Sequence, residues 1–324
     1  MLPLQNRQRL PFKPIIIKPG KYRPGFYHTW EGQKNARKGF FMSFQGEIIR
    51  SRQNKYISLL CSLERKKARD ETGLFRFDGV KLFCEAVRHE VEISFVVICK
   101  SAEEQILSKI RDVGGFELSQ DDFHIICVSD DLFEKISEEK SPEGIICVAK
   151  HIDKFHKIVK IYNEGEISLL SSEKILLLDS LRDPQNVGAV IRSAAAFGVD
   201  RVIMSADCAD IYNPKTLRSC MGTLFGMKVD RVESLPEAVC ILQRAGRHVY
   251  AATLGEKCLT LGEDELLADS CVVIGNEGHG VGEKTVSVCS GCVMIPMSDG
   301  VESLNASTAA TVFLWEFFGK KKRY

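Results

Sequence analysis

Five short apolar runs in the second half of the chain constrain its fold more than any other feature. They cover residues 175–179, 202–204, 249–252, 271–274 and 293–295, and stretches with helical spacing separate them. Strands buried on both faces have this composition, and they occur in parallel sheets that helices cover on both sides. The sequence therefore predicts an α/β domain with a parallel sheet, in which a ligand would bind at the carboxyl ends of the strands.

A smaller mixed α/β unit is predicted ahead of this sheet. Its expected strands cover 74–77, 91–99, 123–128 and 144–149, and its expected helices cover 54–68, 80–88, 102–113 and 129–136. Alternating strands and helices favour a layered sandwich, and the unit shows no catalytic constellation, so we interpret it as a binding module. The 324 residues suit two domains. We assign residues 46–150 to this binding module, 151–172 to a polar linker and 173–324 to the parallel-sheet domain.

The net charge of +1 conceals an uneven distribution along the chain. Residues 1–70 contain 16 Lys and Arg against 4 Asp and Glu, whereas the remainder contains 28 against 39. A basic segment on an acidic body is typical of a protein that binds a polyanion. Aromatic residues such as Tyr22 and Trp30 interleave the basic ones and would suit base stacking. Alternatively, residues 1–45 are a disordered extension, because disorder concentrates at chain ends.

Composition also excludes several classes of protein. No apolar run approaches the ~18–20 residues of a membrane helix. Arg7, Arg9 and Lys13 interrupt the first residues, unlike a secretory signal, so we expect a cytoplasmic protein. The 12 cysteines are scattered, mostly within apolar segments, as free buried cysteines are. Cys289 and Cys292 form one CxxC pair, but no partner follows at zinc-ligand spacing, and we predict no metal site.

The first polar motif follows the run at 175–179 and reads Asp183-Pro-Gln-Asn186-Val-Gly188. A helix is predicted to begin near Asn186, which is a good N-cap residue. Gly188 permits the close approach of another backbone or of a ligand. Arg192 lies about 1.7 turns further along, near the same face, inside an apolar helix where a charge needs a partner. Asn186 is therefore either a helix cap or a functional residue, whereas Arg192 is harder to explain as structural.

Two more polar motifs follow later strands. The first reads Gly275-Asn-Glu277-Gly-His279-Gly-Val-Gly, and its glycines require unusual backbone angles or close packing. This spacing is not GxGxxG, so it supports a dinucleotide site only weakly. The second runs from residue 295, and it places Ser303 and Asn305 at a loop-to-helix junction where free N–H groups point outward. Capping explains each junction alone, but three such junctions in one domain exceed what capping requires.

Together the three segments resemble the motifs of the SpoU/TrmH family of RNA ribose 2′-O-methyltransferases. The resemblance rests on Asp-Pro-Gln-Asn-Val-Gly, Gly-Asn-Glu-Gly-x-Gly and Ile-Pro-Met…Glu-Ser-Leu-Asn in this order, and it covers residues 174–318. More loosely, the preceding half is similar to the substrate-binding domain of many members, with Gly73-Leu-Phe-Arg-Phe-Asp-Gly79 as its marker. Ser193 stands where Thr is common, and residues 306–308 replace a more apolar stretch; both departures are mild.

The resemblance implies a domain of the SPOUT superfamily, with a trefoil knot, that uses S-adenosyl-L-methionine to methylate a ribose in structured RNA. Ribosomal RNA is the expected substrate, and transfer RNA is the alternative. The family works as a homodimer through the C-terminal domain, and helix 305–318 is a candidate interface. By position, the cofactor-binding residues would be Thr253, Leu254, Gly255, Gly275, Asn276, Glu277, Ile295, Met297 and Leu304. The residues implied in catalysis are Arg192, Asn186, Glu277, Ser303 and Asn305.

No general base is evident in the motifs. Arginine is effectively always protonated, so we expect Arg192 to clamp an RNA phosphate while Asn186, Ser303 and Asn305 orient the ribose. His279 is the rival base because imidazole titrates near neutral pH, although it occupies a variable position of its motif. Two other classes stay open. The presence of the motif residues disfavours a catalytically silent RNA-binding protein, and the glycine spacing disfavours a nucleotide-dependent oxidoreductase.

Overall fold

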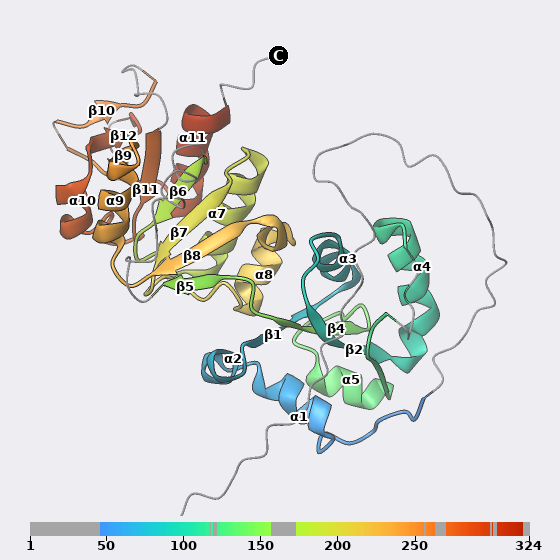
Figure 1. Cartoon of the computed structure of the whole chain (residues 1–324). Coiled ribbons are helices and arrows are strands. Elements are labelled where there is room, and N and C mark those ends of the chain that lie inside the picture. Colours follow the sequence, from blue (N-terminus) through green and yellow to red (C-terminus); the bar gives the residue numbers. More distant parts are fainter. Residues whose placement is uncertain are drawn as a thin grey trace, which may run out of the picture.

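The computed structural model describes most of the chain from residue 46 onward. The described residues are 46–116, 118, 122–156, 173–255, 257–262, 270–298, 300 and 303–319, with the backbone alone at 154–156. The predicted basic extension, residues 1–45, and most of the predicted linker therefore lie outside them. Two sheets organise the described part of the chain, each with its own helices (Figure 1).

The first sheet has four strands in the order β1-β4-β2-β3. β1 and β2 run antiparallel to the central β4, and β3 runs parallel to β2. Helices α3 and α4 pack on one face, and α1 and α5 pack on the other. The strands are β1 (Leu74–Asp78), β2 (Ile93–Cys99), β3 (Ile125–Val128) and β4 (Ile145–Lys150). The helices are α1 (Lys55–Ser62), α2 (Lys66–Thr72), α3 (Val80–Arg88), α4 (Glu103–Gly114) and α5 (Asp130–Ile136).

The single helix predicted over 54–68 is wrong, because the chain forms α1 and α2 there instead. Arg65 adopts an extended conformation between them, with φ −91° and ψ 131°. The buried guanidinium of Arg69 donates hydrogen bonds to the backbone oxygens of Leu63 at 2.7 Å and Glu64 at 2.9 Å. A side chain therefore supplies donors to carbonyl groups at the end of α1, which periodicity cannot reveal.

The second sheet has eight strands in the order β10-β12-β9-β11-β6-β7-β8-β5, and neighbouring strands run parallel. This confirms the predicted fold class; the knot stays a prediction. β5, which pairs with β8, falls within the stretch predicted as a linker. The strands are β5 (Lys154–His156), β6 (Ile175–Leu178), β7 (Arg201–Ser205), β8 (Lys228–Val232), β9 (His248–Ala252), β10 (Leu259–Thr260), β11 (Ser270–Ile274) and β12 (Gly291–Met294).

Helices cover both faces of this sheet, as its apolar runs predict. Leu176 and Leu178 of β6 belong to one buried cluster with α7 (Pro184–Ala196), α8 (Pro214–Cys220) and α11 (Ala306–Leu314). Leu177 points to the opposite cluster, with α9 (Leu235–Arg244) and α10 (Glu283–Val288). Within the described residues, every helix falls short of the apolar length needed to cross a bilayer.

The two sheets share a continuous apolar core. Phe75 and Phe77 of β1 pack against Phe225 of the parallel-sheet domain, with ring centroids 6.3 and 5.2 Å apart. Phe75 also packs against Tyr212, at a centroid distance of 4.5 Å. Beside this cluster, the buried Arg69 of α2 forms an ion pair of 2.6 Å with Asp210. Apolar contacts and an ion pair therefore both hold the first domain against the segments that precede and follow α8.

The hydroxyl group of Tyr212 accepts two hydrogen bonds and donates one. The oxygen accepts from the backbone N–H groups of Ile152 at 2.7 Å and Asp153 at 2.9 Å, and the hydroxyl donates to the Asp153 carboxylate at 2.5 Å. Burial raises the pKa of this phenol, so the proton that it donates is retained. The ring also stacks on His151, with centroids 4.1 Å apart.

We expect Tyr212→Phe to lower the free energy of unfolding by about 1–3 kcal/mol, because it leaves buried donors and a carboxylate without their partner. Urea unfolding followed by circular dichroism measures this loss. Tyr250→Phe is the matched control, since Tyr250 is also buried but its hydroxyl makes no hydrogen bond with the described residues. Equal midpoints for Tyr212→Phe and the unaltered protein would contradict the expectation.

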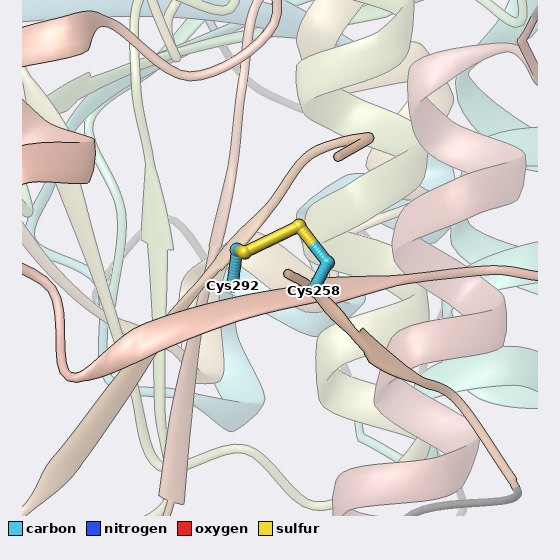
Figure 2. The surroundings of a disulfide bond; sticks show 2 residues. All are labelled: Cys258 and Cys292. Carbon is cyan, nitrogen blue, oxygen red and sulfur yellow. A yellow bond between two sulfur atoms is a disulfide. The ribbon is translucent and has the colours of Figure 1, made fainter. Parts of the chain in front are cut away.

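The expectation that the cysteines are free is wrong for one pair. Cys258 and Cys292 form a disulfide, whereas the other ten cysteines are free (Figure 2). Leu259 of β10 pairs with Val293 of β12 in a parallel ladder, so the residue before each lies opposite the other, with Cα atoms 4.6 Å apart. This separation is within disulfide reach. The cysteines are 34 residues apart in sequence, and only the strand register brings them together.

Candidate active site

A cavity of about 390 Å³ lies at the carboxyl ends of β9, β11 and β12. Its walls are residues 252–254, 274–278, 293–295 and 303–304, together with Gly280, Met297 and the side of α11 that carries Ala306, Ala309 and Phe313. This is the edge of the sheet at which the parallel topology predicts a ligand.

The predicted cofactor residues all line the cavity, with the exception of Gly255. The backbone oxygen of Gly255 instead accepts a hydrogen bond from the backbone N–H of Cys258 at 3.1 Å. The prediction missed the cavity residues of α11 and the last residues of the strands, such as Ala252 and Ile274. Sequence offers no signal for them, because an apolar residue at a strand end or on a helix face serves a core equally well.

The glycine-rich segment after β11 folds back on itself. Asn276 and Gly280 exchange both backbone hydrogen bonds, at 2.8 and 2.9 Å. A Cβ atom built on Gly275 would lie 2.1 Å from the carbonyl carbon of Gly280, so no side chain fits there. Gly280 itself has a φ of +68°, which favours glycine. The close packing that the glycines predict is therefore packing of the loop against its own backbone.

Side chains anchor this loop to the end of β6. Asn276 donates from Nδ2 to the backbone oxygen of Ser180 at 2.8 Å, and its Oδ1 accepts from the N–H of Gly278 at 2.9 Å. The buried carboxylate of Asp179 accepts from the N–H of Gly282 at 3.0 Å. The Asn276 side chain, predicted to bind cofactor, is thus engaged within the loop. The role of Asp179 was not predicted from the sequence.

One residue from each of the three motifs meets beside the cavity. Asn186 donates from Nδ2 to Oε1 of Glu277 at 2.9 Å, and Asn305 donates from Nδ2 to Oδ1 of Asn186 at 3.1 Å. Oδ1 of Asn305 accepts from the N–H of Ser307 at 2.9 Å, so this residue also caps α11. Glu277 and Ser303 line the cavity directly. Four of the five residues predicted to act in catalysis are therefore gathered at one place.

Asn186 is not the N-cap of its helix, so that alternative is wrong. α7 begins at Pro184, and Asp183 is the cap, its carboxylate accepting from the N–H of Gln185 at 2.9 Å. Proline suits the first helical position because its nitrogen carries no hydrogen. Asn186 therefore lies in the first turn, where its amide is free to join Glu277. The prediction that Gly188 permits close approach is confirmed, since a Cβ there would lie 2.5 Å from the backbone oxygen of Thr216.

Arg192 is the predicted catalytic residue that the structure does not bring to the cavity. Asn186 is buried, whereas Arg192 is exposed, so the expectation that they share a helix face is wrong. Six residues at about 100° each leave the two side chains about 120° apart. The guanidinium makes no hydrogen bond or ion pair with the described residues, and its charge is solvated rather than buried. His279 is also exposed and does not line the cavity.

The cavity offers apolar surface beside a carboxylate. Leu254 and Leu304 line it with 59% and 38% of their surfaces exposed, although large apolar side chains are usually buried. Glu277 places its carboxylate in the same wall. Small-molecule sites of roughly 300–1,000 Å³ combine apolar walls and a few polar groups in this way. In the described part of the chain, His, Cys, Asp and Glu form no cluster of three or more that could hold a metal ion.

Comparison with known proteins identifies the family. Residues 173–315 match the sequence profile of the SpoU rRNA Methylase family, and residues 54–147 match that of the MRM3-like substrate binding domain. The chain is 30% identical to the 23S rRNA (guanosine-2′-O-)-methyltransferase RlmB of Coxiella burnetii, over 59% of this chain and 75% of that protein. The chain belongs to the SpoU methylase family.

Other relatives of this SpoU family member match over most of its length. The 23S rRNA (guanosine(2553)-2′-O)-methyltransferase RlmP of Bacillus subtilis is 29% identical, over 84% of this chain and 99% of that protein. The crystal structure of an AdoMet-bound rRNA methyltransferase from Sinorhizobium meliloti superposes with a TM-score of 0.68 at 23% identity, covering 86% of this chain and 99% of that one. The latter similarity shows that both sheets and their helices follow a known fold.

Proposed function

We propose that this SpoU family member transfers a methyl group from S-adenosyl-L-methionine to a ribose 2′-hydroxyl of ribosomal RNA. The observation that carries the proposal is the hydrogen-bonded set Asn186, Glu277 and Asn305, which joins three motifs beside one cavity. The names of two relatives support the substrate class. They are 2′-O-methyltransferases of 23S rRNA, one acting on a guanosine and one, from Streptomyces viridochromogenes, on a uridine.

The cavity has the chemistry that S-adenosyl-L-methionine requires. When bound, this cofactor supplies an electrophilic methyl group on a sulfonium sulfur. The exposed side chains of Leu254 and Leu304 would bury its apolar parts, and the carboxylate of Glu277 would bind its polar or cationic groups. Asn186 and Asn305 hold that carboxylate in one orientation. Two related structures with this fold, a methyltransferase from Sinorhizobium meliloti and AviRb from Streptomyces viridochromogenes, contain bound AdoMet.

The residues of this chain would then act mainly by positioning. Methyl transfer requires in-line geometry, and fixing that geometry supplies much of the acceleration. Ser303, at the cavity wall, would orient the ribose. Arg192 would bind an RNA phosphate through its two-pronged guanidinium and polarise the hydroxyl, whose proton would pass to a phosphate oxygen or to water.

The position of Arg192 supports action between two copies of the chain. It projects from α7 away from the buried Asn186 and does not line the cavity of its own chain. We propose a homodimer in which Arg192 of one protomer serves the cavity of its partner. Most apolar residues of α11 are buried within the chain, but Trp315, which follows α11, is 47% exposed and would be available to such an interface. We place this enzyme in the cytoplasm.

Titration calorimetry of the purified protein with S-adenosyl-L-methionine, run beside NAD, tests the cofactor. We expect a Kd of about 1–100 µM for the first ligand and no heat from the second, because working affinities of enzymes for small ligands fall in this range. Transcripts of 23S rRNA incubated with enzyme and cofactor should then acquire ribose methylation at one nucleotide. Binding of NAD alone would contradict the proposal, and binding of neither ligand would favour a silent RNA-binding protein.

A further inference from the structure

Thr253 and Leu254 form part of the cavity wall, and the chain continues from them to the edge strand β10 and Leu261. The N–H of Thr253 donates to the backbone oxygen of Val293 at 3.2 Å, and that of Leu261 donates to the oxygen of Met294 at 2.8 Å. Between these points lies β10, a strand of two residues at the end of the sheet. Leu254, in the same segment, lines the cavity. The geometry of this wall therefore depends on how the edge strand is held against β12.

The Cys258–Cys292 disulfide holds the middle of this segment. It joins the residue before β10 to the residue of β12 that directly precedes Val293, the first β12 residue in the cavity wall (Figure 2). Both cysteines are half-buried rather than enclosed. The bond therefore lies one residue from the cavity wall on one strand and four residues from Leu254 on the other.

The remaining cysteines show that this is not a disulfide framework. Ten are free, and seven of these are buried among apolar side chains. Secreted domains that depend on disulfides engage their cysteines in several bridges. In reducing compartments disulfides are rare, and those that form are usually transient, catalytic or redox-sensing. The composition of the chain thus favours a bond that opens and closes.

A neighbouring thiol does not compete for the bond. Cys289 precedes Cys292 by three residues, but burial raises the pKa of the Cys289 thiol to about 12. The thiolate is the attacking species in thiol–disulfide exchange, so Cys289 stays protonated and inert at neutral pH. The reductant of the bond is therefore a thiol from solution rather than Cys289.

We propose that Cys258 and Cys292 form a reversible redox latch that sets the affinity of the cavity for S-adenosyl-L-methionine; this inference rests on the proposed function. In reduction, the thiolate of one glutathione attacks one sulfur, the Sγ–Sγ bond breaks and a mixed disulfide forms. A second glutathione thiolate then attacks the mixed disulfide. The products are glutathione disulfide and two protein thiols, which have gained two electrons and two protons. Oxidation by glutathione disulfide is the reverse.

The closed latch preorganises the wall. It restricts the segment that carries Leu254 before any ligand arrives, which removes part of the ordering cost of binding. With the latch open, this edge loses its covalent link to β12 and keeps its backbone hydrogen bonds and the packing of Leu259 against the apolar core, so the wall is formed in a smaller fraction of molecules. Apparent affinity falls in proportion to that fraction. The oxidised protein therefore binds the cofactor more tightly.

The test is calorimetric titration with S-adenosyl-L-methionine after equilibration in oxidised or reduced glutathione, with maleimide labelling and mass spectrometry to count free thiols. We expect reduction to raise Kd about 3–10-fold and to add two labelled cysteines. Cys258→Ser should show the reduced affinity in both buffers. The matched control is Cys240→Ser, which removes an exposed free thiol and should respond to glutathione as the unaltered protein does.

Three results would overturn the latch: equal affinity in both buffers, labelling of Cys258 and Cys292 in oxidised glutathione, or a bond that persists in reduced glutathione. If neither form binds the cofactor, the proposed function fails, and the latch is judged separately by hydrogen exchange. The amide of Leu261, which donates to Met294, should then exchange faster after reduction. An unchanged exchange rate would reject the latch by itself.

Discussion

Gly275→Ala is expected to abolish S-adenosyl-L-methionine binding and to lower the stability of the C-terminal domain. The added Cβ would lie 2.1 Å from the carbonyl carbon of Gly280 and 2.2 Å from the nitrogen of Val281. Backbone atoms cannot rotate away as the end of a side chain can, so the loop must open. Opening breaks the paired hydrogen bonds of Asn276 and Gly280 and displaces Glu277. We expect a loss of about 3 kcal/mol, at the upper end of overpacking effects.

A neighbouring glycine provides the matched control. A Cβ on Gly278 would meet only Oδ1 of Asn276, at 3.5 Å, which is ordinary van der Waals contact. Gly278→Ala should therefore keep the unfolding midpoint and stay folded at the temperature of the binding assay. Urea unfolding and calorimetric titration of both variants measure the two effects. Normal cofactor binding by Gly275→Ala would show that the loop geometry is not needed for the cavity.

Arg192→Ala is expected to lower turnover by about 10³-fold while leaving cofactor affinity and stability nearly unchanged. Loss of a single preorganised hydrogen-bond donor at a reacting centre costs about 10²–10³-fold, and Arg192 would supply two charge-assisted bonds to one phosphate. The side chain is exposed, without hydrogen bonds to the described residues, so its removal leaves no buried partner. Methylation kinetics with saturating RNA and cofactor, together with calorimetry, separate the two quantities. Lost cofactor binding would refute this assignment.

Two controls make this result specific. Arg244→Ala removes another exposed arginine, from α9, and should retain full activity. Mixing Arg192→Ala protein with Glu277→Gln protein tests action between protomers. If Arg192 serves a partner's cavity, mixed dimers contain one complete site and activity partly returns. Activity that stays at the level of the separate variants would place the action of Arg192 within its own chain.

The apolar strands of the second sheet could be predicted from the sequence, whereas the strand that contains paired charges was missed. β8 was not predicted, because its sequence contains Asp230 and Arg231. Asp230 is buried and pairs with Arg201, and Arg231 pairs with Asp153 at 2.5 Å. Hydropathy patterns register these charges as solvent-exposed, since a partner supplied by another strand cannot be seen locally. β10, with two residues, is too short for any periodicity.

For the site, the motifs indicated which residues matter but not how they are connected. Asn186 and Glu277 are 91 residues apart, and Asn186 and Asn305 are 119 apart. Their spacing along the chain gave no indication that the three side chains would form a chain of hydrogen bonds. Helix geometry alone could have separated Asn186 from Arg192, because a six-residue interval does not return to the same face. The role of Asp179 could not be predicted without knowing the position of Gly282, which is 103 residues away in the sequence.

The aromatic packing between the two sheets has a consequence for target selection. With Phe75 and Phe77 packed on Phe225, and Arg69 bonded to Asp210, the first domain cannot swing freely about a hinge. A structured RNA held by that domain would present its nucleotides at set distances from a methyl donor. If the first domain binds the RNA, the distance between that domain and the cavity would contribute to the choice of the methylated nucleotide.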